Sequence, residues 1–304
     1  MRIGASLTSA QAGTESREGA RLMIERAIAA RKAGLASLFV GDHHNVGSPY
    51  YQNVPMMARL LAEWGDATAG CLFLLPLWNP VLVAEQVGTL ASIAQGPFVV
   101  QCALGDGRAQ FGAMGVNIKN RPSMFEESID MVKRLLDGET VNGTRRFLSA
   151  DRARVSPLPP EHVDFWIGGS AEASVDRAAR LGDGYLGGPE LTPERAAHWA
   201  SFYRDQCKVH GRQVGRLALR RDVYVGDSTA DAEAIAGPIL DRGYRGFAPD
   251  ALVFGDPERV AEQFRAYGAM GYTDIIIRHM TNDREPVLGS YARLAEVRQA
   301  TAND

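Results

Sequence analysis

The sequence predicts a single-domain (β/α)₈ barrel, and three observations support this fold class. Eight short runs of β-forming residues are spread over the 304 residues, helical patterns lie between most of them, and the alternation begins and ends on a strand. Strands that alternate with helices form parallel sheets, and eight such units can close into a barrel. Residues 1–304 are expected to form one domain, because barrels of this length commonly stay undivided.

The expected strands are short and rich in β-branched or small residues. They are Arg2–Leu7, Ser37–Gly41, Ala67–Leu75, Phe98–Gly105, Phe165–Gly168, Gly184–Gly187, Ala218–Gly226 and Thr273–Arg278. If the sheet closes, the first of these strands must pair with the last.

The expected helices are marked by apolar spacing and by residues typical of helix ends. Ser16–Gly34 ends on a glycine that suits the position after a helix. Pro80 stands where the helix Val81–Ala94 should begin. The other expected helices are Phe125–Leu136, Ala171–Leu181, Pro193–His210 and Pro257–Met270.

Three longer segments interrupt the alternation, and we expect insertions after strands 4, 5 and 7. Asn117–Pro122 and Thr140–Pro160 look irregular, whereas Asp227–Gly255 contains a helix of its own. Segments inserted into a barrel in this way usually form active-site loops or interfaces. The alternative fold is a doubly wound sheet. It is disfavoured because SAQAGTES, and no Gly-rich dinucleotide turn, follows the first strand.

Composition excludes several classes of protein. A net charge of -3 lacks the basic footprint of a nucleic-acid binder or a polybasic membrane anchor. Cys71, Cys102 and Cys207 show no paired spacing, which argues against a disulfide framework and fits a reducing cytoplasm. The longest apolar run, residues 67–78, is too short to span a bilayer. We expect a cytoplasmic protein.

Titratable residues follow the second and eighth strands, at the barrel end where catalytic groups gather. Asp42, His43 and His44 stand together after the second strand, where a carboxylate beside imidazoles can bind, orient or protonate a ligand. Adjacent strand residues face opposite sides, so either histidine can be the functional one. Arg278 follows three isoleucines at the eighth strand. The alternative for the second strand is that Asp42 only caps a turn and one histidine packs beneath it. The alternative for Arg278 is an ordinary charge at the rim of the barrel.

Small residues at two other strand ends predict contacts to a cofactor. Gly105 and Gly107 follow the fourth strand and leave room for a flat ring. The fifth strand runs through Gly168, Gly169 and Ser170 straight into a helix that starts at Ala171, and the free amides of such a turn favour an anion. The sequence therefore predicts a phosphate cradle there, unless Ser170 is only a helix cap.

Four segments, in this order, resemble the luciferase-like superfamily of flavin-dependent monooxygenases and deazaflavin-dependent reductases. They are FVGDHH, LFLLPLWNPVLVAEQVGTL, GPFVVQCALGDGRAQFGAMGV and FWIGGSAEASVDRAARLGDGY. The resemblance covers nearly the whole chain and is best from Met1 to about Gly188. It agrees with the barrel inferred from the strand count.

The resemblance implies a set of site residues. Asp42 and His43 match the acidic–His pair that lies against the flavin ring, and Gly70–Cys71 matches a non-proline cis peptide that supports it. Such a bond costs about 3 kcal/mol or more. The implied cofactor-binding residues are Gly70, Cys71, Ala103, Gly105, Gly107, Gly168, Gly169, Ser170 and Ala171. Ala103 departs from the luciferases, which carry a reactive cysteine there, so light emission is not expected.

The resemblance also implies the activity. We expect an oxidoreductase or monooxygenase that uses reduced FMN on a small organic substrate, with His43, Asp42 and Arg278 as the catalytic residues. Coenzyme F420 with direct hydride transfer is the alternative cofactor. A non-catalytic flavin-binding barrel is the alternative of another class, and a metal-dependent hydrolase lacks a spaced ligand set. The expected partner protein is a reductase that supplies the reduced cofactor. The chain itself is expected to form a homodimer.

Overall fold

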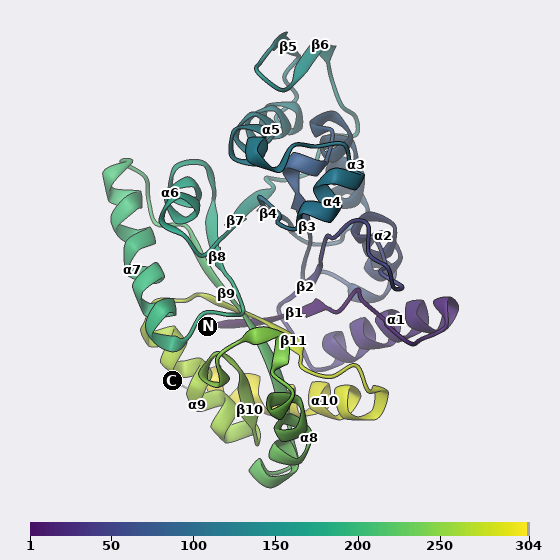
Figure 1. Ribbon diagram of the computed structural model, residues 1–304, viewed down its shortest axis with the longest axis vertical. Helices are drawn as coiled ribbons and strands as arrows, with labels where there is room; N and C mark the ends of the chain where they lie inside the picture. The colour runs from purple at the N-terminus through teal and green to yellow at the C-terminus, as the bar shows by residue number, and fades with distance from the viewer. Residues whose placement is uncertain (303–304) are drawn as a thin grey trace.

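Eight parallel strands close into a barrel in the computed structural model, which describes residues 1–302 (Figure 1). In ring order they are β1 (Arg2–Leu7), β2 (Ser37–Val40), β3 (Thr68–Leu74), β4 (Phe98–Ala103), β7 (Asp164–Gly168), β8 (Gly184–Gly187), β9 (Arg216–Val225) and β11 (Asp274–His279). Strands β1 and β11 pair in parallel, Arg2 opposite Asp274 and Ala5 opposite Ile277. The predicted barrel and its closure are confirmed.

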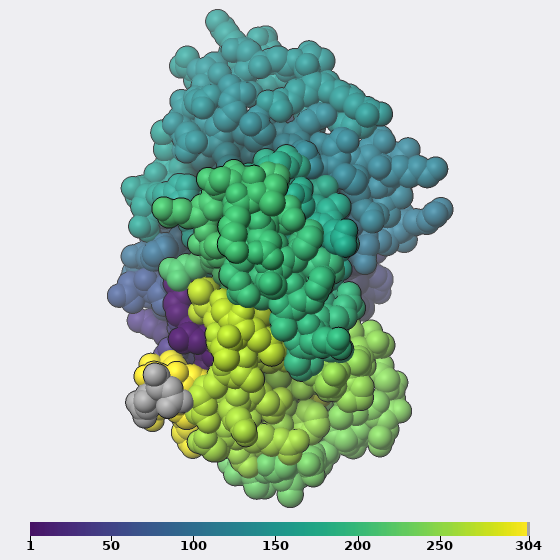
Figure 2. All heavy atoms as spheres, turned by 90° about the vertical axis from the view of Figure 1, so that its left-hand side faces the viewer, coloured from purple at the N-terminus to yellow at the C-terminus, as the bar shows by residue number. Residues whose placement is uncertain are grey.

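Helices surround the barrel. They are α1 (Ser16–Lys32), α2 (Asn53–Trp64), α3 (Pro80–Ile93), α5 (Arg121–Leu136), α6 (Glu172–Leu181), α7 (Pro193–Val209), α9 (Pro257–Ala269) and α10 (Arg284–Ala302). Two of these, α2 and α10, were not among the helices expected from the sequence. Because α10 follows β11, the chain does not end on a strand. Figure 2 shows the first residues of the chain surfacing beside the last helix, as ring closure requires.

The insertions fall after β4 and β9. The segment after β4 holds α4 (Arg108–Ala113) and an antiparallel hairpin of β5 (Val141–Thr144) and β6 (Ser149–Ala153), which projects from the barrel in Figure 1. The prediction that Thr140–Pro160 is irregular is therefore wrong. Its residues are mostly exposed and lack the alternating apolar pattern of a strand. The insertion expected after the fifth strand is also absent, since three residues join β7 to α6.

The insertion after β9 contains the expected helix, α8 (Thr229–Asp241), and a short strand, β10 (Val253–Gly255). β10 pairs in parallel with the carboxyl end of β9. Four single 3₁₀ turns complete the described elements: Leu75–Leu77, Ile118–Asn120, Tyr244–Gly246 and Pro249–Ala251. No helix within residues 1–302 is both long enough and apolar enough to cross a membrane.

Side chains fill the barrel interior below its mouth. Phe39, Val99, Trp166, Ala218 and Ile276 form one buried cluster, in which the Phe39 and Trp166 ring centres lie 5.6 Å apart. These residues come from five different strands. The interior is therefore a packed core and not a channel through the barrel.

The expected cis or bulged peptide at Gly70–Cys71 is wrong. Gly70 pairs with Phe39 on one side and Val99 on the other without a break in register, and the cis bond recorded within residues 1–302 is Ser156–Pro157. A Cβ at Gly70 would lie 2.2 Å from the Val99 carbonyl oxygen and 2.8 Å from the Phe39 ring. Close packing inside the barrel therefore explains this glycine.

Candidate functional site

Two adjoining cavities open at the carboxyl ends of the barrel strands. The first, which we call the glycine cavity, has a volume of about 500 Å³. Its lining includes Leu72, Leu74, Ala103, Gly105, Arg121, Gly168, Gly169, Ser170, Glu190 and Arg220. The second, which we call the arginine cavity, has a volume of about 240 Å³, and its lining includes Ser6, Ser9, Asp42, His43, Leu72, Tyr50, Arg220, Arg245 and Arg278. Leu72 and Arg220 line both.

Backbone and small apolar groups build the glycine cavity. Gly105 has a φ of 72°, a conformation in which other residues are strained, and a Cβ there would lie 3.3 Å from Leu74. At the end of β7, Ala171 precedes α6 without a side-chain cap, so the first amides of the helix are free for an anion. A Cβ at Gly169 would lie 2.3 Å from Cβ of Ser174, so this turn requires glycine.

A carboxylate that sequence reasoning missed contacts the same turn. Ser170 hydrogen-bonds to Glu190, which follows β8, and both line the glycine cavity. The glycine cavity therefore has an acid beside the turn that leads into α6. Arg121 and Arg220 are the cations in its lining. The sequence spacing of twenty residues between Ser170 and Glu190 carried no signal of this contact.

Asp42 fixes His44 in place, while His43 lies elsewhere. One carboxylate oxygen of Asp42 accepts hydrogen bonds from the Leu74 amide at 2.8 Å and from Trp78 Nε1 at 2.8 Å. The other oxygen lies 3.3 Å from Nε2 of His44. The nearby Asp42 carboxylate raises the pKa of His44 above its ordinary value, against the opposing effect of burial. The possibility that Asp42 sets the tautomer of His43 is therefore not realised.

His43 lines the arginine cavity. Its ring centre lies 6.0 Å from that of Tyr50, and its backbone carbonyl accepts a hydrogen bond from Gln52 at 3.2 Å. Burial, with Asp42 nearby, raises the pKa of Tyr50 to about 12. Tyr50 therefore stays a neutral hydrogen-bonding group near neutral pH, and His43 is the histidine that a molecule in this cavity would meet.

Three arginines surround one buried carboxylate at the other wall. Asp222 is completely buried and accepts hydrogen bonds from Arg278 at 2.9 Å, Arg245 at 2.8 Å and the Tyr244 hydroxyl at 2.9 Å. Nε of Arg220 lies 3.8 Å from it. Although burial alone raises the pKa of Asp222, the three guanidiniums hold it below its ordinary value. Burial, with Arg278 nearby, lowers the pKa of Arg220 to about 10.

The sequence predicted only Arg278 from this cluster. Arg220 and Asp222 are two apart on β9, so they share a face of the strand, and opposite charges two residues apart in a largely buried strand are a signal that could have been used. His279, next to Arg278, points the other way. Its ring packs 4.4 Å from Tyr291 of α10, and burial, with Arg26 nearby, lowers its pKa to about 3.

Four of the predicted cofactor-binding residues lie outside both cavity linings. Gly70 and Cys71 are in the packed part of β3, with Cys71 completely buried and its Sγ 3.9 Å from the Asn53 carbonyl oxygen. Gly107 and Ala171 directly precede α4 and α6, respectively. Regular packing of β3 removes the structural reason for placing a ring against Gly70–Cys71.

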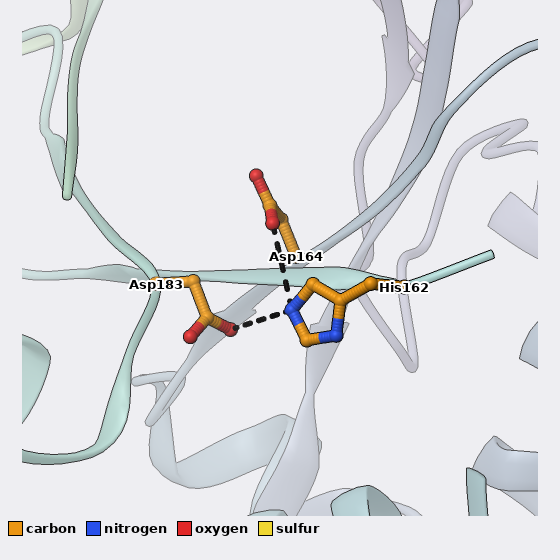
Figure 3. A group of neighbouring side chains, drawn as sticks. All are labelled: His162, Asp164 and Asp183. Atoms are coloured by element: carbon orange, nitrogen blue, oxygen red, sulfur yellow. Dashed lines mark ion pairs between the residues drawn. The ribbon is translucent and has the colours of Figure 1, made fainter. Parts of the chain in front are cut away.

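A group of possible metal ligands lies at the opposite end of the barrel. Nε2 of His162 is 3.7 Å from Asp164 and 3.9 Å from Asp183, and Figure 3 shows its ring facing both carboxylates. Asp183 already pairs with Lys133 at 3.1 Å and Arg212 at 3.6 Å. These ion pairs and the distance from the strands' carboxyl ends give the group no part in the site.

Residues 1–251 match the model of a family described as luciferase-like monooxygenase. This chain belongs to that family. F420-dependent glucose-6-phosphate dehydrogenase of Beutenbergia cavernae is 25% identical over 309 residues, covering 90% of this chain and 91% of the relative. The protein of the same name from Nakamurella multipartita is 22% identical over 303 residues, covering 88% and 89%.

Solved structures share the fold. Monooxygenase RslO1 of Streptomyces bottropensis superposes with a TM-score of 0.84 at 18% identity, covering 97% of this chain and 98% of that one. The oxygenating constituent of 3,6-diketocamphane monooxygenase from Pseudomonas putida, in complex with FMN, gives 0.83 at 16%, covering 99% and 98%. An F420-dependent secondary alcohol dehydrogenase gives 0.81 at 17%, with the same coverage. The predicted family and fold are confirmed, and both cofactors occur among proteins of this fold.

Proposed function

We propose that this protein is a luciferase-like oxidoreductase that binds a reduced flavin or deazaflavin in the glycine cavity and a small organic substrate in the arginine cavity. The observation that carries the proposal is the adjacency of the two cavities, which share Leu72 and Arg220 at the carboxyl ends of the strands. One offers small residues and free amides, and the other offers titratable groups. A cofactor and a substrate need these two environments within contact distance.

The residues of the glycine cavity suit such a cofactor. Gly168, Gly169 and Ser170, together with the free amides that begin at Ala171, would hold its phosphate, as α6 favours an anion at its start. Ala103 and Gly105 would flank the rest of the molecule, with Gly107 just beyond the cavity lining. Leu72 and Leu74 provide the apolar wall, in place of Gly70 and Cys71 deeper in the strand.

F420 and FMN are both candidates. F420 supplies hydride transfer to a substrate carbon, whereas reduced FMN supplies electrons for oxygenation. We place F420 first, because the relatives that match over about nine-tenths of the chain are named for it. FMN, which the sequence favoured, is the second candidate, supported by the family description and by the FMN-bound structure of the same fold.

The chain's own residues would then orient the reactants and handle a proton. His43 lines the arginine cavity, and an imidazole is a side chain that can donate or accept a proton in catalysis. Asp42 supports it indirectly, since Asp42 ties the end of β2 to Leu74 and Trp78. Arg278 would act on the substrate from the opposite wall.

The direct test is a titration of the purified protein with oxidised FMN and oxidised F420, followed by fluorescence quenching. We expect saturable binding of one of the two cofactors. A variant in which the glycine cavity is blocked should lose this binding. Binding of neither by the folded protein would reject the proposal. Cofactor binding in which His43→Ala leaves turnover unchanged for every substrate found would favour a non-catalytic binding barrel.

A further inference from the structure

The arginine cavity contains more positive charge than its bonded carboxylate neutralises. Arg220, Arg245 and Arg278 converge on Asp222, so the cluster has three guanidiniums and one carboxylate. Asp42 also lines the cavity and adds a second negative charge, although its carboxylate already accepts hydrogen bonds from Leu74 and Trp78. Three guanidiniums and two carboxylates leave the cavity with a surplus of one positive charge.

Two of these guanidiniums have donors without a partner. Nε of Arg220 and Nε of Arg278 are buried atoms without a hydrogen-bond acceptor among the described residues, and Oδ1 of Asp222, 3.8 Å from Nε of Arg220, is likewise without a donor. The Arg220 and Arg278 side chains are only 22% and 18% exposed. A buried charge with unsatisfied donors is costly in a folded protein unless an oppositely charged group can reach it. The surplus charge and the partly exposed guanidiniums that line the cavity thus point to an anionic ligand.

A segment inserted after β9 completes this wall. Arg245 lies in the short turn Tyr244–Gly246 and adopts a φ of 52°, an uncommon conformation for a residue other than glycine. Its guanidinium reaches Asp222 beneath it and lines the cavity. A purely structural reading, in which the cluster only anchors this turn to the barrel, accounts for the Asp222 bonds but leaves the surplus charge unexplained.

We propose that the arginine cavity binds an oxyanionic group of the substrate, a carboxylate or a phosphate, between Arg220, Arg245 and Arg278. The planar guanidinium fork matches the paired oxygens of both groups. The cavity, about 240 Å³, suits a small headgroup, and the shared residues Leu72 and Arg220 direct the rest of the molecule toward the glycine cavity. The substrate class is thus a small organic acid or phosphate ester. This inference rests on the proposed function in assigning the anion to the substrate.

The test measures oxyanion binding to the cofactor-free protein by calorimetry, with inorganic phosphate and malonate as probes. We expect one probe to bind, and its identity distinguishes a phosphate site from a carboxylate site. Arg245→Gln should weaken that binding at least tenfold. Arg59→Gln is the matched control, since Arg59 is similarly exposed (48% against 40%) and pairs with Glu63 on α2, and it should bind as the unmodified protein does.

Asp222→Asn separates a binding site from a structural cluster. Removing the internal carboxylate should strengthen binding of the probe severalfold, because the ligand then faces all three guanidiniums alone. If this variant does not fold, Arg245→Gln still decides the matter. Binding that Arg245→Gln leaves unchanged, or that Asp222→Asn weakens in the folded state, would overturn the proposal, as would the absence of binding of both probes.

Two further measurements distinguish a failure of this inference from a failure of the proposed function. Gly169→Asp blocks the turn before α6, so probe binding that this variant abolishes would belong to the glycine cavity and would refute an anion site at the arginines. Arg245→Gln should also bind FMN or F420 as the unmodified protein does. If it loses the cofactor instead, the arginines serve the cofactor, and the substrate assignment falls while the proposed function stands.

Discussion

The glycine cavity and the arginine cavity meet at Leu72 and Arg220, yet they are built from different parts of the chain. The first depends on backbone: free amides and glycines at the ends of β4 and β7. The second depends on side chains from β1, β3, β9 and β11, from the segment after β2 and from the Tyr244–Gly246 turn. A site made of backbone leaves a local signature of small residues, whereas one made of distant side chains does not. The two should also respond differently to mutation.

The largest effect should come from the histidine in the arginine cavity. His43→Ala should lower turnover by roughly a hundredfold while the protein stays folded, because a general acid or base typically contributes this much. Steady-state rates and a thermal melt of the same preparation provide the check. The control is His44→Ala, which removes the partner of Asp42 and should lower the melting temperature. If His43→Ala retains normal turnover, or fails only by unfolding, the catalytic role is wrong.

A smaller effect should follow from closing the glycine cavity. Gly169→Asp should weaken cofactor binding more than tenfold (about 1.4 kcal/mol), because it adds negative charge and forces a Cβ against Ser174. Fluorescence titration measures this change. Gly237→Asp is the control, as that glycine in α8 faces open space and should leave affinity unaltered. Equal affinity in the two variants would argue against a phosphate at this turn.

The acid in the glycine cavity offers a change in the opposite direction. Glu190→Gln should strengthen binding of a phosphate-bearing cofactor about fivefold, since a charge a few ångströms from the phosphate costs about 1 kcal/mol even when well solvated. The same titration measures it, at low salt. Weaker binding in Glu190→Gln would mean that Glu190 contacts the cofactor as an acceptor, and the anion would have to lie elsewhere.

The smallest expected effect concerns pH and the Asp42–His44 pair. The folded protein raises the pKa of His44, so the pair's contribution to stability is full below the ordinary histidine pKa and is lost as pH rises through the raised value. The melting-temperature difference between the unmodified protein and His44→Gln should therefore shrink from about pH 5 to about pH 9. A difference that grows with pH would contradict the assignment of the bond to His44.

Local sequence was enough for the barrel and for much of the glycine cavity. Apolar strands alternate with helices, and the run from Gly168 to Ala171 predicts a strand-to-helix turn made of small residues. Local sequence gave the wrong role for Gly70, which makes room for Phe39 in the barrel interior. It also gave no sign of Glu190, which reaches Ser170 from the segment after the next strand. In both cases the reason for the residue lies on a different strand.

The sequence by itself determined the strand count, the family and the end of the barrel at which Asp42, His43 and Arg278 gather. Those properties follow from periodicity and from residues that are adjacent in the chain. Only the tertiary structure decided that Asp42 bonds to His44, that His43 faces a cavity, and that Arg220 and Arg245 join Arg278 around Asp222. Side-chain contacts between distant strands depend on barrel closure and on the path of an inserted turn, and neither leaves a pattern in the local sequence.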